Sequence, residues 1–137
     1  MTHSLDELYR DLEKAGITVI PCIFEENKSI SLQKGKVIGI DRQKLFGRVE
    51  ERTILIHEEG HFVSGAFYFP YSPYLIRGQA EWRANKAAIL MHIPKEELET
   101  CFAQGITELW DLAEYFNVTE DFMRMAVDYY REQELAG

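Results

Sequence analysis

The sequence predicts an α+β domain that is mostly helical and carries a small β-sheet near its N-terminus. Ser4 and Glu7 form a capping box before apolar residues at helical spacing, and Gly16 marks the end of this first helix. Polar and apolar residues alternate between residues 29 and 33, as in a half-buried strand. Beyond residue 46 the apolar spacing is mainly helical, so helices are expected to outweigh strands.

The individual elements follow in chain order from local signals. Strands are expected over residues 17–24, 29–33 and 37–41, with Lys34 and Gly35 in a hairpin turn between the last two. A long helix is expected from about residues 46–49 to 64–65, followed by an aromatic loop over 67–75 that contains Pro70 and Pro73. The remaining expected helices cover residues 76–91, 94–104, 108–116 and 120 to about 132.

The length and the cysteine content indicate one compact domain. The 137 residues are expected to form a single domain, 1–137, whose C-terminal part at about 94–135 is helical. Cys22 and Cys101 lie far apart and form neither a disulfide framework nor a thiolate zinc pair, which favours a reducing, cytoplasmic compartment. No apolar leader and no run of about 18 apolar residues is present, so neither secretion nor membrane insertion is expected.

The charge of the chain argues against direct nucleic-acid binding. The formal net charge is −8, whereas phosphate binding depends on Lys and Arg. Residues 112–130 resemble a helix-turn-helix in shape, but residues 107–135 carry two basic side chains, Arg124 and Arg131, against eight acidic ones. We therefore expect these helices to pack on the rest of the domain or to contact a protein partner, through Trp110, Phe116, Phe122 and Met123.

The most informative motif is HEEGH at residues 57–61, inside an apolar stretch. On a helix, His57 and His61 lie roughly 40° apart on one face, and Glu58 falls within the same roughly 100° arc. Neutral imidazole suits Zn²⁺, and a catalytic zinc lowers the pKa of its water to about 7, so that a nearby Glu can take the proton. The motif predicts His57 and His61 as metal ligands and Glu58 as general base. The competing interpretation is a chance occurrence of H-E-x-x-H in a helix.

A third ligand must come from another segment, and Glu81 is the candidate. It follows His61 by 20 positions, which fits a second helix packed against the first. The pattern with a further Gly and His is excluded because those positions hold Ser64 and Phe67. A His₂Glu site prefers Zn²⁺ but accepts Mn²⁺ or another divalent ion. The alternative is that Glu81 is a solvated surface carboxylate.

Together with HEEGH, the pattern E-x-x-A-N, present as Glu81, Ala84 and Asn85, resembles the ImmA/IrrE family of small metallopeptidases. The resemblance covers about residues 17–131 and implies a zincin-like domain with His57, His61 and Glu81 as ligands and Glu58 as base. It also implies a helix-packing role for Asn85, or a role in support of the ligands. One turn from Glu81, Asn85 is placed to orient that carboxylate, and a plain surface position is the alternative.

Members of that family are typically encoded by bacteria, phages and mobile elements, and several cleave a helix-turn-helix repressor. The resemblance therefore implies a cytoplasmic, zinc-dependent endopeptidase whose protein substrate is such a repressor. A non-proteolytic protein that keeps the metal fold and acts by binding a repressor is the second hypothesis, and a DNA-binding module is the third. The sequence indicates no oligomeric state.

Two further features are interpreted less specifically. Residues 37–40 are expected either to form a core strand or to line the cleft and pair with an extended substrate. In the aromatic loop, a tyrosine hydroxyl or Arg77 is a candidate to stabilise an oxyanion, with plain packing as the alternative. His3 and His92 lack ligand spacing and are interpreted as structural or solvated.

Overall fold

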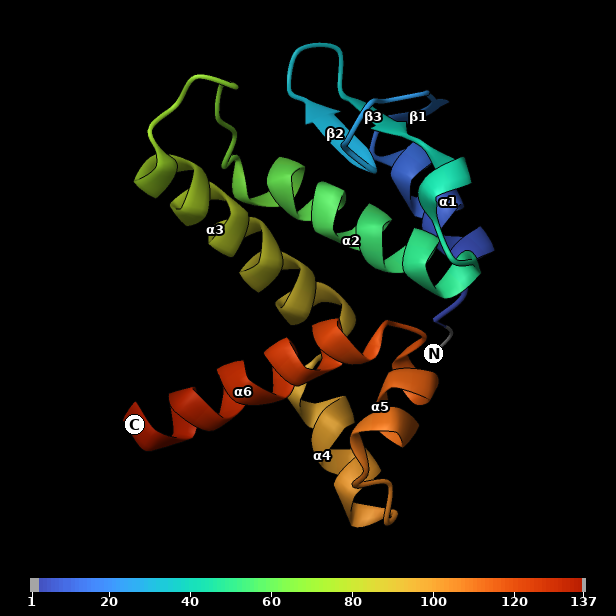
Figure 1. Cartoon of the computed structure of the whole chain (residues 1–137). Helices are drawn as coiled ribbons and strands as arrows, with labels where there is room; N and C mark the ends of the chain where they lie inside the picture. Colours follow the sequence, from blue (N-terminus) through green and yellow to red (C-terminus); the bar gives the residue numbers. More distant parts are fainter. Residues whose placement is uncertain (1–2, 137) are drawn as a thin grey trace.

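The computed structural model describes residues 3–136 and confirms an α+β, mostly helical fold. In chain order its elements are α1 (Leu5–Lys14), β1 (Thr18–Pro21), β2 (Ser29–Leu32), β3 (Val37–Ile40), the short 3₁₀ helix η1 (Arg42–Lys44), α2 (Arg48–Ser64), α3 (Tyr74–His92), α4 (Lys95–Ala103), α5 (Leu109–Phe116) and α6 (Glu120–Ala136). Helices α2 and α3 cross the middle of the molecule, with the sheet and α1 on one side and α4 to α6 on the other (Figure 1). Among the described residues, no helix combines the length and apolar character that a membrane crossing requires.

The sheet has the order β1-β3-β2, with β3 in the centre. Strand β3 runs parallel to β1 and antiparallel to β2, and the β2–β3 hairpin turns through Gly35 and Lys36, which both have positive φ. The prediction that residues 37–40 pair with a substrate is therefore wrong, because both edges of β3 are already occupied. Ile38 and Ile40 are fully buried, so the core-strand interpretation is confirmed. The edge that remains open on the hairpin side belongs to β2.

The predicted capping of the first helix is confirmed, since the Ser4 side chain accepts a hydrogen bond from the Glu7 backbone N–H at 3.1 Å. Leu8 and Leu12 of α1 are buried in the same core as Ile38 and Ile40 of β3. The first strand is shorter than the expected 17–24 and ends at Pro21, although the next residue, Cys22, still donates its N–H to the carbonyl oxygen of Ile40 at 2.8 Å. The sheet thus packs its central strand over the helical core and leaves β2 near α2.

Helices α2 and α3 approach each other unusually closely at Gly60. A Cβ built on Gly60 would lie 2.9 Å from the carbonyl carbon of Ala84 and 3.2 Å from its Cα, which is too close for a side chain. Because neither helix presents a bulky residue at this crossing, residues one turn away on the two helices are brought within reach of each other. The pair α2–α3 is therefore set at a separation that only small residues allow.

The C-terminal helices are joined to α2 by a buried arginine. Arg52 is 2% exposed, and its guanidinium donates to the carbonyl oxygens of Phe116 (2.8 Å) and Asn117 (3.0 Å) at the end of α5. Phe116, Phe122 and Met123 are buried, as expected for packing, whereas Trp110 is largely exposed. The helices α4 to α6 thus continue the core of α2 and α3.

The remaining histidines and both cysteines have structural surroundings. His3 lies 2.6 Å from Glu97, and His92 lies 2.7 Å from Glu59, each as a partly buried pair that joins two elements. Cys22 and Cys101 are free thiols, and Cys101 is buried. None of these residues contacts the cluster described below.

Candidate metal centre

His57, His61 and Glu81 converge at the place where α2 and α3 pack together. One donor atom from each lies within 4.8 Å of the other two. Glu81 Oε2 lies 2.5 Å from His57 Nε2 and 3.3 Å from His61 Nε2. The structure therefore brings together the three residues that the sequence nominated as ligands, from two helices 20 positions apart in the chain. That they bind a metal remains a prediction.

The opposite nitrogen of each imidazole is held by the protein. His57 Nδ1 donates to the side-chain oxygen of Asn85 at 2.6 Å, and His61 Nδ1 donates to the backbone carbonyl of Ala66 at 2.6 Å. The carbonyl of Ala66 reaches His61 because Gly65 ends α2 with φ of 70°, a conformation that favours glycine. Both rings consequently turn their Nε2 atoms toward Glu81, which is the arrangement that orients imidazole ligands in metal sites.

Asn85 contacts one of the candidate ligands, but not the one that its spacing suggested. Its predicted roles were helix packing, support of the ligands or a plain surface position, and the hydrogen bond considered was to Glu81, one turn earlier on the same helix. In the structure Asn85 instead contacts His57 on the neighbouring helix. The reason is that the close α2–α3 crossing brings the inward faces of the two helices together, so the hydrogen bond forms between helices and not along one.

Glu58 lies beside the cluster and is not one of its three converging groups. Its side chain is 7% exposed, and its Oε1 lies 4.0 Å from His61 Nε2. Its other oxygen, Oε2, accepts a hydrogen bond of 2.5 Å from the hydroxyl of Ser29 on β2. A carboxylate fixed next to the donor cluster, yet outside it, has the position that a general base requires. No local sequence pattern predicted this role for Ser29, since the contact spans 29 positions and depends on how the sheet covers α2.

Tyr68 is the aromatic-loop residue that reaches the cluster. Its hydroxyl donates to Glu81 Oε1 at 2.5 Å, so both oxygens of Glu81 have partners. Burial and this hydrogen bond raise the pKa of Tyr68 to about 12. In contrast, Tyr71 and Tyr74 are more than four-fifths exposed, and Tyr71 stacks on Phe69. The sequence did not distinguish Tyr68 from these neighbours, because all of them share one loop.

Hydrogen bonds and nearby charges shift the pKa values of the three converging side chains. Although burial opposes charge on His57, its hydrogen bond with Glu81 and the nearby Glu58 and Glu81 carboxylates raise its pKa above the usual value. The same balance raises the pKa of His61. Burial likewise opposes charge on Glu81, but the hydrogen bonds from both imidazoles and Tyr68 hold its pKa well below the usual range. A divalent cation such as Zn²⁺ would have to displace the protons from the Nε2 atoms, and the cluster would then offer two imidazole nitrogens and one anionic oxygen, a donor set that suits this ion.

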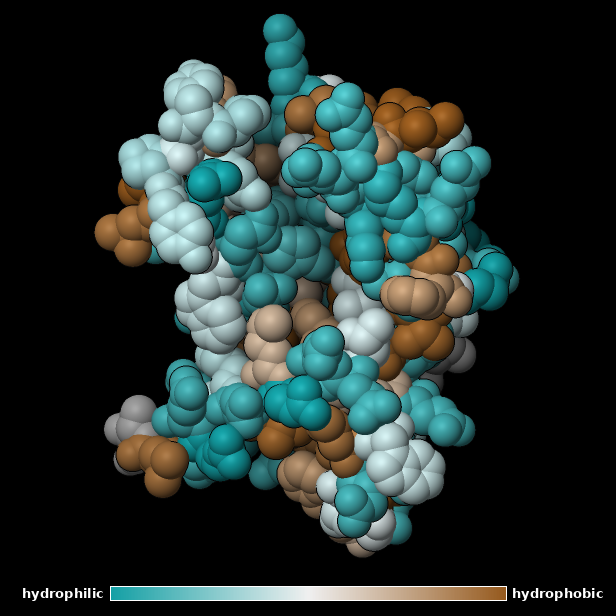
Figure 2. Space-filling view, viewed as in Figure 1, coloured by the Kyte–Doolittle hydropathy of each residue, from teal (hydrophilic) through white to brown (hydrophobic). Residues whose placement is uncertain are grey.

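A cleft of about 390 Å³ opens onto this cluster. Its walls come from β2, from Glu58 and His61 of α2, and from Tyr68, Arg77 and Glu81. The space-filling view shows the hollow between the α2–α3 connection at the upper left and the sheet at the upper right (Figure 2). The cleft is therefore bounded on one side by the edge strand and on the other by the aromatic loop.

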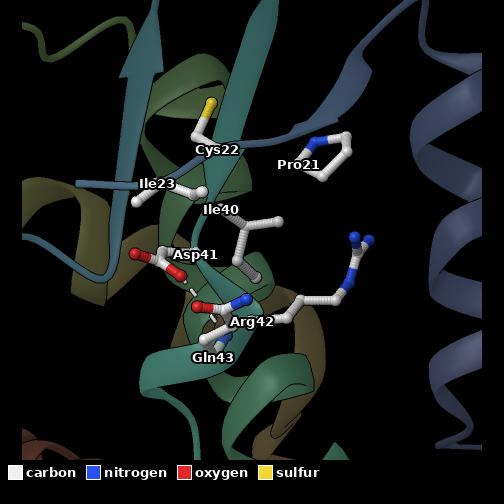
Figure 3. Close-up of a pocket in the computed structure, with 7 residues that line it drawn as sticks. All are labelled: Pro21, Cys22, Ile23, Ile40, Asp41, Arg42 and Gln43. Carbon is white, nitrogen blue, oxygen red and sulfur yellow. Dashed lines mark hydrogen bonds between the residues drawn. The ribbon is translucent and has the colours of Figure 1, made fainter.

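A second hollow, of about 570 Å³, lies near the ends of β1 and β3. Its two charged side chains already have partners: Asp41 accepts from the Phe24 N–H and from Lys44, and Arg42 donates to Tyr9. Figure 3 shows Asp41 and Arg42 extending to opposite sides of the hollow. This hollow is larger than the cleft, but it has no converging donors, so chemistry and not volume identifies the candidate site.

Comparison with known proteins assigns no family, since no family model matches the chain and no curated protein matches it. The interpretation of the cluster therefore depends on the motifs and on the geometry described above.

Proposed function

We propose that this protein is a zinc-dependent endopeptidase of the ImmA/IrrE type. The observation that carries the proposal is the convergence of His57, His61 and Glu81 beside the buried Glu58, at the floor of an open cleft. In this proposal His57, His61 and Glu81 hold the cation, and Mn²⁺ or another divalent ion is the alternative to zinc. The free thiols Cys22 and Cys101 favour a cytoplasmic location.

A cation held there supplies a Lewis acid that acidifies a water molecule and polarises an amide carbonyl. Glu58 takes the proton of the attacking water and passes it to the nitrogen of the leaving amine. The open oxygen for this transfer is Oε1, because Oε2 is occupied by Ser29. Tyr68 and Arg77 line the same cleft and are the candidates to stabilise the oxyanion. The Tyr68 hydroxyl has one proton, so it would have to release Glu81 Oε1 to do so.

The proposed substrate is a protein segment in extended form. Strand β2 lines the cleft, and among the described residues it pairs with β3 alone, which leaves one backbone edge for an added strand. The net charge of −8 is compatible with a positively charged partner, such as the DNA-binding face of a helix-turn-helix repressor. A repressor encoded by a phage or mobile element is therefore the substrate that we propose.

The decisive experiment compares Glu58→Gln with Glu59→Gln. The two residues are adjacent in the motif, but Glu59 pairs with His92 away from the cleft, so it provides a matched control. Glu58→Gln should retain stoichiometric metal and reduce cleavage of a candidate repressor at least about 100-fold, the lower range for a lost general base. Glu59→Gln should cleave normally. Full activity of Glu58→Gln would refute the assigned role of Glu58.

The second hypothesis, a binder without proteolysis, is separated by a chelator. Purified protein is incubated with candidate repressors, with and without the chelator, and the products are identified by mass spectrometry. A fragment that disappears with chelator and returns with added zinc supports the peptidase. A stable complex without fragments supports the binder.

A further inference from the structure

We propose that Ser29 is a positioning residue that fixes the orientation of Glu58. This inference rests on the proposed function, because it assigns Ser29 a part in the peptidase reaction. Its basis is the 2.5 Å hydrogen bond from the Ser29 hydroxyl to Glu58 Oε2. Ser29 lies in β2 and lines the same cleft as Glu58 and the donor cluster.

Few other contacts hold the Glu58 carboxylate in one orientation. Its side chain is 7% exposed, and Ser29 is the only side chain among the described residues that donates a hydrogen bond to it. The terminal torsion of a glutamate is broad, so a carboxylate without a hydrogen-bond partner samples many orientations. A buried carboxylate oxygen without a donor is also costly. The Ser29 hydroxyl therefore holds one oxygen and leaves Oε1 directed toward His61 Nε2, 4.0 Å away.

The position of Ser29 is itself determined by the sheet. Ser29 pairs with Ile40 in the β2–β3 register, and Ile40 is fully buried in the core. A slip of β2 by one residue would turn Ser29 to the other face of the sheet and remove the hydrogen bond. The strand that borders the cleft thus also sets the orientation of the general base.

Three variants test the proposal, with Ser4→Ala as the matched control. Ser4→Ala also removes a serine hydroxyl that forms a hydrogen bond, in this case with the Glu7 backbone N–H, but Ser4 precedes α1 and does not line the cleft. Ser29→Ala should lower kcat about 10–100-fold, as expected when a partner of a site residue is lost, with KM and zinc affinity within about twofold of wild type. Ser29→Thr, which keeps the hydroxyl, should restore most of kcat. Ser4→Ala should keep the wild-type kcat and KM.

A measurement independent of activity examines the contact itself. Urea unfolding of the metal-free protein is compared for Ser29→Ala, Glu58→Ala and the double variant. Ser29→Ala should lower the urea midpoint in the wild-type background and leave it unchanged in the Glu58→Ala background. Additive effects would show that the two side chains do not interact and would overturn the proposal.

The kinetic outcomes are equally decisive. Unchanged kcat in Ser29→Ala, failure of Ser29→Thr to restore it, or an equal loss of kcat in Ser4→Ala would overturn the proposal. A parallel loss of zinc affinity in Ser29→Ala would assign Ser29 a structural role instead. A wild-type protein that cleaves nothing would overturn the peptidase function and the catalytic part of this proposal together, and the unfolding cycle would then report on the contact alone.

Discussion

Substitution of Gly60 by alanine tests whether the α2–α3 crossing builds the site. The added Cβ would meet the carbonyl oxygen of Ala84 first, and even the carbonyl carbon behind it, at 2.9 Å, is about 0.5 Å closer than the 3.4 Å at which ordinary contact begins. The obstructing atoms are backbone, so α3 must move as a helix. Glu81 is one turn from Ala84 and would move with it, whereas metal sites tolerate about 0.2 Å in ligand distance.

The expected magnitudes follow from this geometry. Because the obstructing atoms are backbone, the upper part of the overpacking range applies, about 2–3 kcal/mol, and alanine recovers about 1 kcal/mol of helix propensity. We therefore expect Gly60→Ala to lose about 1–2 kcal/mol of unfolding free energy. Zinc affinity should fall at least about tenfold, as for other displaced site groups. Gly78 is the control, because it lies within α3 and a Cβ there meets nothing within 4 Å. Gly78→Ala should gain up to about 1 kcal/mol and bind zinc normally.

Urea unfolding and chelator-competition titration measure these two quantities. The reasoning would be refuted if Gly60→Ala unfolded at the wild-type midpoint and kept wild-type zinc affinity. A loss of stability without a loss of affinity would show that α3 adjusts locally and that Glu81 does not move with Ala84.

Three further predictions concern the surroundings of the site. Asn85→Ala should lower zinc affinity about 10–100-fold because His57 loses the acceptor that orients it. Asn85→Asp keeps an acceptor and should bind zinc normally. Wild-type zinc affinity of Asn85→Ala in a titration would contradict this prediction. Arg52→Ala should lose about 2–3 kcal/mol of unfolding free energy, because two carbonyl groups at the end of α5 lose a charged donor. Urea unfolding measures this loss, and a change under about 0.5 kcal/mol would contradict the prediction. Asp41→Asn should weaken the acid dependence of stability. The hydrogen bond from Lys44 holds the pKa of Asp41 below its usual value, so its stabilisation is present above the unfolded pKa of about 3.9 and is lost as pH falls through the lower folded pKa. Unfolding midpoints are measured as a function of pH for both proteins. If the midpoint of Asp41→Asn falls with acid as steeply as that of the wild type, Asp41 does not contribute to the acid dependence of stability.

The elements and part of the site were accessible from local sequence. His57, Glu58 and His61 are close in the chain, so the helical repeat alone fixes which face they share. The capping box at Ser4 and the hairpin turn at Gly35 likewise act within a few residues. The sequence could name Glu81 only as a candidate ligand, because the position of Glu81 relative to the histidines depends on how two helices pack.

The errors have one common cause. Residues 37–40 were considered for substrate pairing because that strand precedes the motif helix, but the strand order β1-β3-β2 places it in the centre and gives the edge to β2. For Asn85 a hydrogen bond to Glu81 was considered because the two residues are neighbours on one helix, whereas Asn85 contacts His57 on the other. In both cases sequence proximity was used where spatial proximity decides.

Local sequence patterns were enough to predict the helices and strands and the face of one helix that carries His57, Glu58 and His61, because periodicity and capping act over a few residues. The tertiary structure alone decided which groups meet that face: Glu81 and Asn85 across the glycine crossing, Ser29 from the edge strand, and Tyr68 from the loop. The physical reason is that these contacts join residues distant in the chain, and their distances are set by packing, strand order and register, which no local pattern encodes.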